Sequence, residues 1–536
     1  MLDWLKKGDG GHLDASMRTP ASAAKLLAGM RQADPAAALE ELTSWLEKGL
    51  PGHDAKLRSQ VLSQIHESGS AHVGALLPQF LGKRPGNGGQ ADSSSWEILS
   101  RYLLVLAHTL YTSARTPLKD PDSSQSLRLV AAGDAARCIH TCRTLAKACL
   151  MRYLSVPAKL WRMAYAVHDK AEKVGCAATP VHLQDSGKSA TTVTQELLRL
   201  LMLHSCAPEM MAPRQIEVAD RVAEQLGQDF TLRPRGMADN PFCFDPASDL
   251  PPRRSSGEPS GADSTLRFFG AGAGLGALER LHRELAAARV EDVKAFGRDI
   301  DPYTQVAATR HLLAFWGPTC PYTPPARSQA TGELRLIHGH ARVWQELWSA
   351  RSTSTELTLL EDGASGPEAP DTWTLQDTGG NELGAEIPAA SRERARCGNV
   401  VGVSMNGSDE LWVGVIRSMH ARRDGCLHAT IAVLSRAPRA VEARTLYAQG
   451  EETGYSAEAA RQFAFNRACA IVLDDGSEAS RTPNLLLPAE SWKEGRVYEV
   501  ALNGSTRHLR GVQLLRRGDD YVRVTLEWVE QAESVA

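Results

Sequence analysis

Apolar side chains recur at helical spacing in the sequence as far as about residue 318. Leu103, Leu106 and Leu110 fall on one face of a helix, because residues three or four apart lie side by side on its surface. A second stripe, with steps of four, three and four residues, consists of Cys138, Cys142, Leu145 and Cys149. The pattern predicts an all-α N-terminal half made of several helices.

Segments rich in Gly, Pro and Ser interrupt this helical pattern. They contain too few apolar side chains to form a core, so we expect them to be loops or disorder. The expected order is a flexible tail (1–19), a helical segment (20–82), a linker (83–95), a helical bundle (96–232), a disordered linker (233–263) and a further helical segment (264–318).

After Pro325 the apolar period changes from helical spacing to alternation, as in the run from Tyr521 to Trp528. Dipeptides that favour tight hairpin turns lie among these runs: Asn406-Gly407, Asp424-Gly425, Asp475-Gly476 and Asn503-Gly504. We therefore expect a multidomain α plus β protein. Its C-terminal half is predicted to hold an antiparallel β-barrel over 326–447 and a second small β unit over 465–530, in one sheet system or two.

Composition excludes several classes of protein. The 536 residues contain 60 Lys and Arg against 63 Asp and Glu, which argues against a general nucleic-acid coat. No apolar run approaches the roughly 20 residues that span a bilayer, and the N-terminal stretch lacks the apolar segment of a secretory signal. Ten cysteines without a C-x-x-C pair favour neither a disulfide scaffold nor a zinc site. The expected location is the cytoplasm.

Motifs for catalysis are missing from the sequence. It has no G-x-S-x-G elbow and no H-E-x-x-H metalloprotease motif. The glycine run from Gly270 to Gly276 lacks the βαβ context of a dinucleotide site, and a flexible lead into a helix explains it better. His338 and His340 would share one face of a strand, yet no third metal ligand lies nearby. We expect no enzyme, no catalytic residue, no bound metal and no cofactor.

Arginine is concentrated in the predicted barrel. Twelve arginines and no lysine lie between Ser328 and Tyr447, and Arg392, Arg394 and Arg396 fall in one short segment. The planar guanidinium pairs with phosphate through two parallel hydrogen bonds. The arginines therefore form either a phosphate-binding cluster or an ordinary solvated loop.

The segment from Trp373 to Ile387 resembles a PilZ-type β-barrel. That family has an R-x-x-x-R pair before its first strand and a D/N-x-S-x-x-G motif on a later one. Asp377 stands at the D/N position of this motif, with Gly379 in place of Ser and Glu382 in place of Gly. The run from Trp412 to Arg417 is also similar to the family, and the resemblance covers about residues 326–446.

The resemblance implies cyclic di-GMP as the ligand. Two phosphates would pair with two guanidinium groups, and a short polar strand would contact the guanine edges. The implied nucleotide-binding residues are Arg327, Asp377, Gly379, Arg392 and Arg396. Arg392 and Arg396 have the R-x-x-x-R spacing but follow the strand motif, whereas Thr331 stands four residues after Arg327.

Three hypotheses follow for the whole chain. In the first, it is a bacterial PilZ-like signalling adaptor that binds cyclic di-GMP and contacts an unknown protein partner through its helical half. In the second, it is an interaction scaffold whose degenerate barrel has lost the nucleotide. In the third, it is an enzyme whose site is not visible in the sequence.

Overall fold

The computed structural model describes residues 19–49, 54–81, 93–119, 123–184, 190–255, 265–289, 292–297, 299–350, 369–392, 394–405, 407–422, 424–446, 467–473, 483–502 and 505–529. The chain divides into two compact units, one spanning 1–83 and 88–323 and the other spanning 84–87 and 324–536. Most of the expected tail (1–19) and of the expected linker (83–95) lies outside the described residues.

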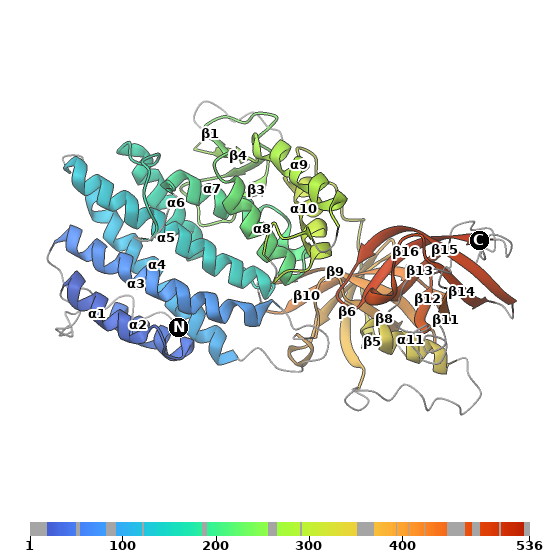
Figure 1. Ribbon diagram of the computed structural model, residues 1–536. Helices are drawn as coiled ribbons and strands as arrows, with labels where there is room; N and C mark the ends of the chain where they lie inside the picture. Colours follow the sequence, from blue (N-terminus) through green and yellow to red (C-terminus); the bar gives the residue numbers. More distant parts are fainter. Residues whose placement is uncertain are drawn as a thin grey trace. The chain divides into compact units, whose positions relative to one another are not determined.

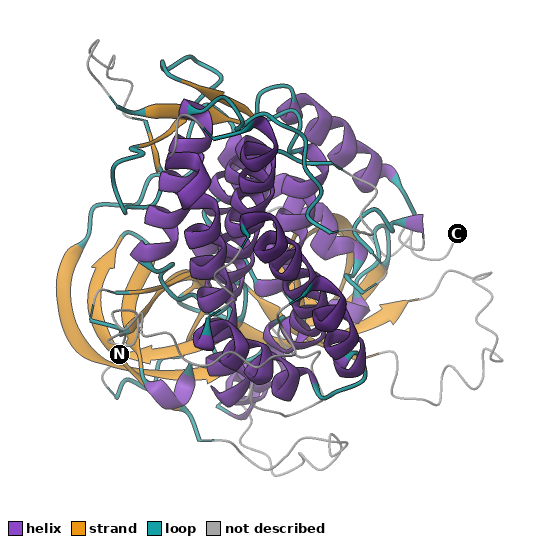
Figure 2. Ribbon diagram, turned by 90° about the vertical axis from the view of Figure 1, so that its left-hand side faces the viewer, coloured by secondary structure: helices purple, strands orange, loops and turns teal. Residues whose placement is uncertain are grey.

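The first unit is helical, as the apolar spacing predicts (Figure 1). Its helices are α1 (Pro20–Met30), α2 (Pro35–Lys48), α3 (Ala55–Leu76), α4 (Ser93–Lys119), α5 (Gln125–Met151), α6 (Ala158–Lys173), α7 (Val193–His204), α8 (Pro213–Leu226), α9 (Gly274–Ala287) and α10 (Pro302–Trp316). The helix α5 is central, because nearly every side chain from Ala131 to Met151 is buried. Neighbouring helices surround it, and Figure 2 shows this bundle of helices from the side.

Short polar side chains fix where several of these helices begin. Asp34 accepts a hydrogen bond from a backbone N–H of the first turn of α2, and Ser124 does the same for α5. Thr192 and Asp301 cap α7 and α10 in this way. Each cap satisfies a backbone donor that has no partner inside the helix, which stabilises the helix start by about 1 kcal/mol.

A small four-stranded sheet lies where the sequence favours a disordered linker. Its strands are β1 (Thr231–Arg233), β2 (Phe242–Phe244), β3 (Arg253–Arg254) and β4 (Arg267–Gly270), in the order β1-β4-β2-β3. The expectation of disorder over 233–263 therefore does not hold for its described residues, 233–255. Phe244 stacks on Tyr165 of α6 with ring centroids 4.7 Å apart, so a few aromatic contacts anchor a segment that is otherwise poor in apolar residues.

The second unit contains two closed six-stranded barrels, as the alternating pattern and its turn signals predict in outline. The first barrel consists of β5 (Ser328–His338), β6 (Asp371–Gly379), β7 (Glu382–Ile387), β8 (Val400–Met405), β9 (Trp412–Ala421) and β10 (Leu427–Ser435). The second consists of β11 (Arg439–Leu446), β12 (Arg467–Val472), β13 (Asn484–Pro488), β14 (Val497–Leu502), β15 (Ser505–Arg517) and β16 (Tyr521–Val529).

The boundary between the barrels differs from the expected one. The first barrel closes through β10, which pairs with both β7 and β9, so β11 belongs to the second barrel rather than to a domain ending at 447. The two strands are separated only by residues 436–438. Alternation alone could not reveal this, because β10 and β11 have the same period.

A helix that the sequence analysis did not predict packs against both barrels. Gly339, with φ of +90°, follows the last residue of β5, and α11 (His340–Ser349) begins immediately after it. The nitrogen Nε1 of Trp344 donates to the carbonyl of Val441 in β11 at 2.9 Å. His338 and His340 therefore do not share a strand face: His338 ends β5, and His340 begins α11.

An apolar cluster from both barrels and α11 forms what we call the shared core. It consists of Ile337, Val343, Trp344, Leu347, Val400, Val413, Val415, Ala440, Ile471, Leu473, Leu486 and Tyr521. Each of these side chains is buried, so the helix and the two barrels bury apolar surface against one another.

Candidate functional site

The structure brings together three of the residues that the PilZ resemblance implies for nucleotide binding. Arg327 lies immediately before β5, Asp377 lies on β6, and Gly379 ends that strand. The Arg327 Nη1 nitrogen donates to Asp377 Oδ1 at 2.5 Å. A side chain at Gly379 would place its Cβ 2.6 Å from the carbonyl oxygen of Ala326, so glycine lets the Arg327 segment pass close to the β6–β7 hairpin.

Glu382, at the start of β7, completes this cluster. Its Oε2 accepts from Arg327 Nη2 at 3.0 Å, and its Oε1 accepts from Arg417 Nη1 at 2.7 Å. Arg327 also donates to the hydroxyl of Thr430 at 3.2 Å. We call Arg327, Asp377, Glu382, Arg417 and Thr430 the first-barrel cluster. Its two guanidinium groups face two carboxylates, so the formal charge of these side chains is balanced.

Two histidines border the first-barrel cluster. The rings of His420 and His428 lie 5.2 Å apart, and His428 Nε2 is 3.7 Å from Asp377 Oδ2. Burial, together with Arg422, lowers the pKa of both imidazoles, and that of His428 falls to about 4. Both rings are therefore neutral at physiological pH and add no positive charge to the cluster.

Arg392 and Arg396 are not part of this cluster. Arg392 Nη2 donates to the carbonyl of Gly425 at 3.1 Å, and Arg396 Nη1 donates to the carbonyl of Ala395 at 3.0 Å. Between them, Arg394 pairs with Asp371. These contacts stabilise the turn that follows β7. In the described residues, no contact joins Arg392 or Arg396 to Arg327.

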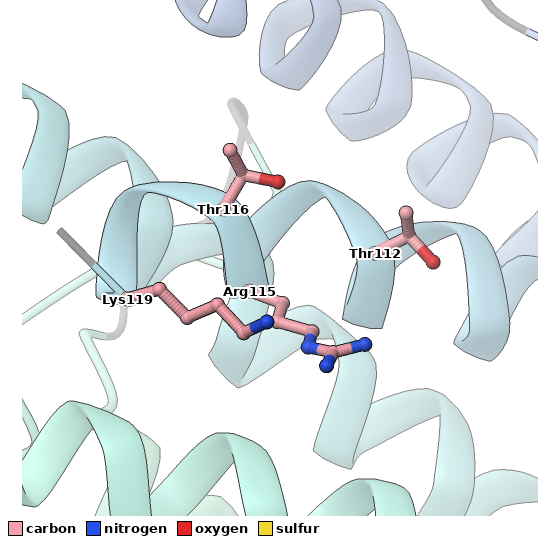
Figure 3. A pocket seen from close by; sticks show the side chains of 4 residues that line it. All are labelled: Thr112, Arg115, Thr116 and Lys119. Atoms are coloured by element: carbon pink, nitrogen blue, oxygen red, sulfur yellow. The ribbon is translucent and has the colours of Figure 1, made fainter.

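The helical unit offers a second, more open basic site. Thr112, Arg115, Thr116 and Lys119 of α4 line a hollow of about 430 Å³ (Figure 3). The Lys119 side chain extends along the helix toward Arg115 in this view. Burial and these two positive charges lower the pKa of Lys170 on α6, which shows that the basic groups of the two helices act on one another.

A buried ionic network crosses the centre of the same unit. The Lys147 ammonium on α5 lies 3.0 Å from Glu217 and 2.8 Å from Asp220, both on α8. On α7, burial would raise the pKa of Glu196, but Arg143 and neighbouring positive groups hold it far below its ordinary value. The sequence analysis missed this network, although from Asp134 to Lys147 the helix α5 presents ionisable residues, His140 included, every three or four positions.

We searched the described residues for groups of side chains suited to a metal ion. In the part of the chain that the structure describes, no three His, Cys, Asp or Glu side chains converge in this way. Among the described helices, none is both long and apolar enough to cross a membrane.

Comparison with known proteins relates the helical unit to a receptor family. Residues 21–235 match a family model described as "Cyclic-di-GMP receptor FimW, N-terminal domain". This range begins in α1 and ends just after β1, so the helices α2 to α8 are similar to that domain. Comparison with curated proteins and with solved structures gives no match.

Proposed function

We propose that this protein is a cyclic di-GMP receptor in a signalling pathway. The observation that carries the proposal is the match of residues 21–235 to the N-terminal domain of a cyclic di-GMP receptor family. A resemblance of the first barrel to PilZ domains supports the same ligand independently, because it rests on residues outside that range. The helical unit would then contact a protein partner and pass on the signal.

The first-barrel cluster contains the groups that such a ligand needs. Guanine presents N–H donors along its Watson–Crick edge, which a carboxylate such as Asp377 accepts, while a guanidinium pairs with phosphate. In the structure these groups satisfy one another, since Arg327 donates to Asp377 and to Glu382. Binding would exchange this internal ion pair for contacts to the base and to the phosphate.

Calorimetric titration of the full chain with cyclic di-GMP tests the proposal. We expect saturable binding that weakens at least tenfold in Arg327→Gln, which corresponds to about 1.4 kcal/mol. The control is Arg335→Gln on β5, which breaks an exposed ion pair with Glu346. The affinity of this control for the nucleotide should equal that of the wild type.

A scaffold that does not bind the nucleotide is the second candidate. The balanced charge of the first-barrel cluster favours it, because two carboxylates repel an anionic ligand unless they bind its bases. An absence of heat and of any thermal shift with saturating cyclic di-GMP would support the scaffold and refute the receptor. Protein partners would then be sought with the helical unit as the docking element.

A further inference from the structure

Two arginines face each other on the outer surface of the second barrel. In the antiparallel pair β15–β16, Arg516 lies directly opposite Arg523, next to a bulge between Leu514 and Arg516. Side chains opposite each other share one face of a sheet, with Cβ atoms about 5 Å apart. Like charges in that position repel, so this pairing costs free energy when nothing lies between them.

Neither arginine has a compensating partner within the described part of the chain. No hydrogen bond or ion pair to Arg516 or Arg523 is found among the residues that the structure describes, and the Nε of Arg523 is buried without an acceptor. Other arginines of β15 differ in this respect. Arg510 lies 3.6 Å from Glu527, and Arg517 donates to the carbonyl of Ala489 at 3.1 Å.

The arginine pair borders the shared core. Tyr521 and Arg523 point to the same side of β16, because alternate residues of a strand share a face. Tyr521 belongs to the shared core, and its hydroxyl is buried without a hydrogen-bond partner. The Nη2 of Arg516 lies 3.9 Å from the point where a Cβ on Gly398 would stand, so this side chain reaches a turn of the first barrel.

Nearby carboxylates do not neutralise the pair. Asp519 and Asp520 follow Arg517 in the β15–β16 turn, and both act on Tyr521 electrostatically. Asp520 Oδ2 accepts a hydrogen bond from the backbone N–H of His340 at 2.7 Å, so this carboxylate binds the start of α11. Counting the described residues, two guanidinium groups and one phenolic hydroxyl remain as donors without acceptors at the junction of the barrels.

We propose that Arg516 and Arg523 bind a phosphate group of a small anionic ligand at this junction. A tetrahedral oxyanion between the two guanidinium groups accepts from both and turns their mutual repulsion into attraction. The Tyr521 hydroxyl supplies a third donor. Where the ligand is cyclic di-GMP, this inference rests on the function proposed above; inorganic pyrophosphate presents the same chemistry without the bases.

The test is titration of the full chain with cyclic di-GMP and, separately, with pyrophosphate. We expect at least one of them to bind saturably, and Arg516→Gln/Arg523→Gln to weaken that binding at least tenfold. Arg510→Gln removes the same charge from the same strand and should bind like the wild type. Arg523→Lys keeps the charge but loses the planar fork, so it should weaken binding several-fold even if the double variant does not fold.

The outcomes separate the two proposals. Wild-type affinity for both probes in the Arg516 and Arg523 variants overturns this site, and the receptor function stands if cyclic di-GMP still binds. Binding of pyrophosphate alone, lost in the double variant, supports the site and refutes the receptor. If neither probe binds saturably, both the arginine site and the receptor function are overturned.

Discussion

The two barrels of the second unit use arginine in opposite ways. In the first barrel, Arg327 lies between Asp377 and Glu382, which neutralise it. In the second barrel, Arg516 lies opposite another arginine and no carboxylate pairs with it in the described residues. The motif around Asp377 that the sequence analysis singled out belongs to the first barrel. The arginine pair without a neutralising carboxylate belongs to the second. The groups around an arginine therefore decide how strongly it attracts a phosphate.

The largest expected effect comes from removing the acid that neutralises the first-barrel cluster. Glu382→Gln leaves Arg327 and Arg417 with a neutral amide in place of a buried carboxylate. We expect the free energy of unfolding to fall by about 2 kcal/mol, the range for hydrogen bonds to charged groups. Chemical denaturation measures this change.

The control for this variant is Glu346→Gln, which breaks the exposed pair with Arg335. It should change stability by no more than about 0.5 kcal/mol. Equal stability of Glu382→Gln and the wild type would show that the first-barrel cluster is not a stabilising ion-pair network, and the comparison between the barrels would lose its basis.

A smaller effect is expected from pH, because the first barrel places histidines of lowered pKa beside its arginines. The pKa of His428 is about 4 in the folded protein, below the ordinary 6.5, so the unfolded chain binds more protons between these values. Stability is fully present above about pH 6.5 and falls as the pH drops toward 4.

His428→Gln removes this titrating group, and its stability should decline less over the same pH window. The difference should be on the order of 1 kcal/mol. Thermal unfolding measured at intervals of pH gives both profiles. Parallel curves for His428→Gln and the wild type would contradict the expected contribution.

The smallest effect has the opposite sign and concerns the second barrel. Arg516→Gln relieves the repulsion with Arg523, so the ligand-free protein should become more stable by about 0.5 kcal/mol at low salt. The gain should shrink as salt screens the repulsion. Destabilisation by Arg516→Gln, measured by denaturation without ligand, would mean that this arginine has a stabilising partner and would remove the contrast with Arg327.

The sequence predicted the broad architecture, and it named Arg327 and Asp377 of the first-barrel cluster as candidates. The stripe of Cys138, Cys142 and Cys149 is buried on α5, and the turn at Asp424-Gly425 joins β9 to β10. Arg327, Asp377 and Gly379 were named through the resemblance, and the structure places them side by side, while their binding of a ligand stays a prediction. Short-range patterns such as the helical stripe and the turn dipeptide are visible in a single sequence.

Features that depend on long-range pairing were not predicted. The opposition of Arg516 and Arg523 depends on the strand register and on a bulge, and neither can be read from alternation. The sheet over 231–270 was missed because aromatic contacts to another helix stabilise it. Helix α11 was missed although Val343, Trp344 and Leu347 recur at helical spacing, because its ten residues lie between two stretches of alternating period.

The shared core also has a consequence for how the C-terminal half unfolds. Separating the barrels would expose Trp344, break its hydrogen bond to Val441, and strip Tyr521 and Leu486 of their apolar neighbours. Unfolding of either barrel would remove apolar contacts that bury side chains of the other barrel. The two should therefore denature in a single cooperative transition, and a protease should find no stable intermediate consisting of one barrel alone.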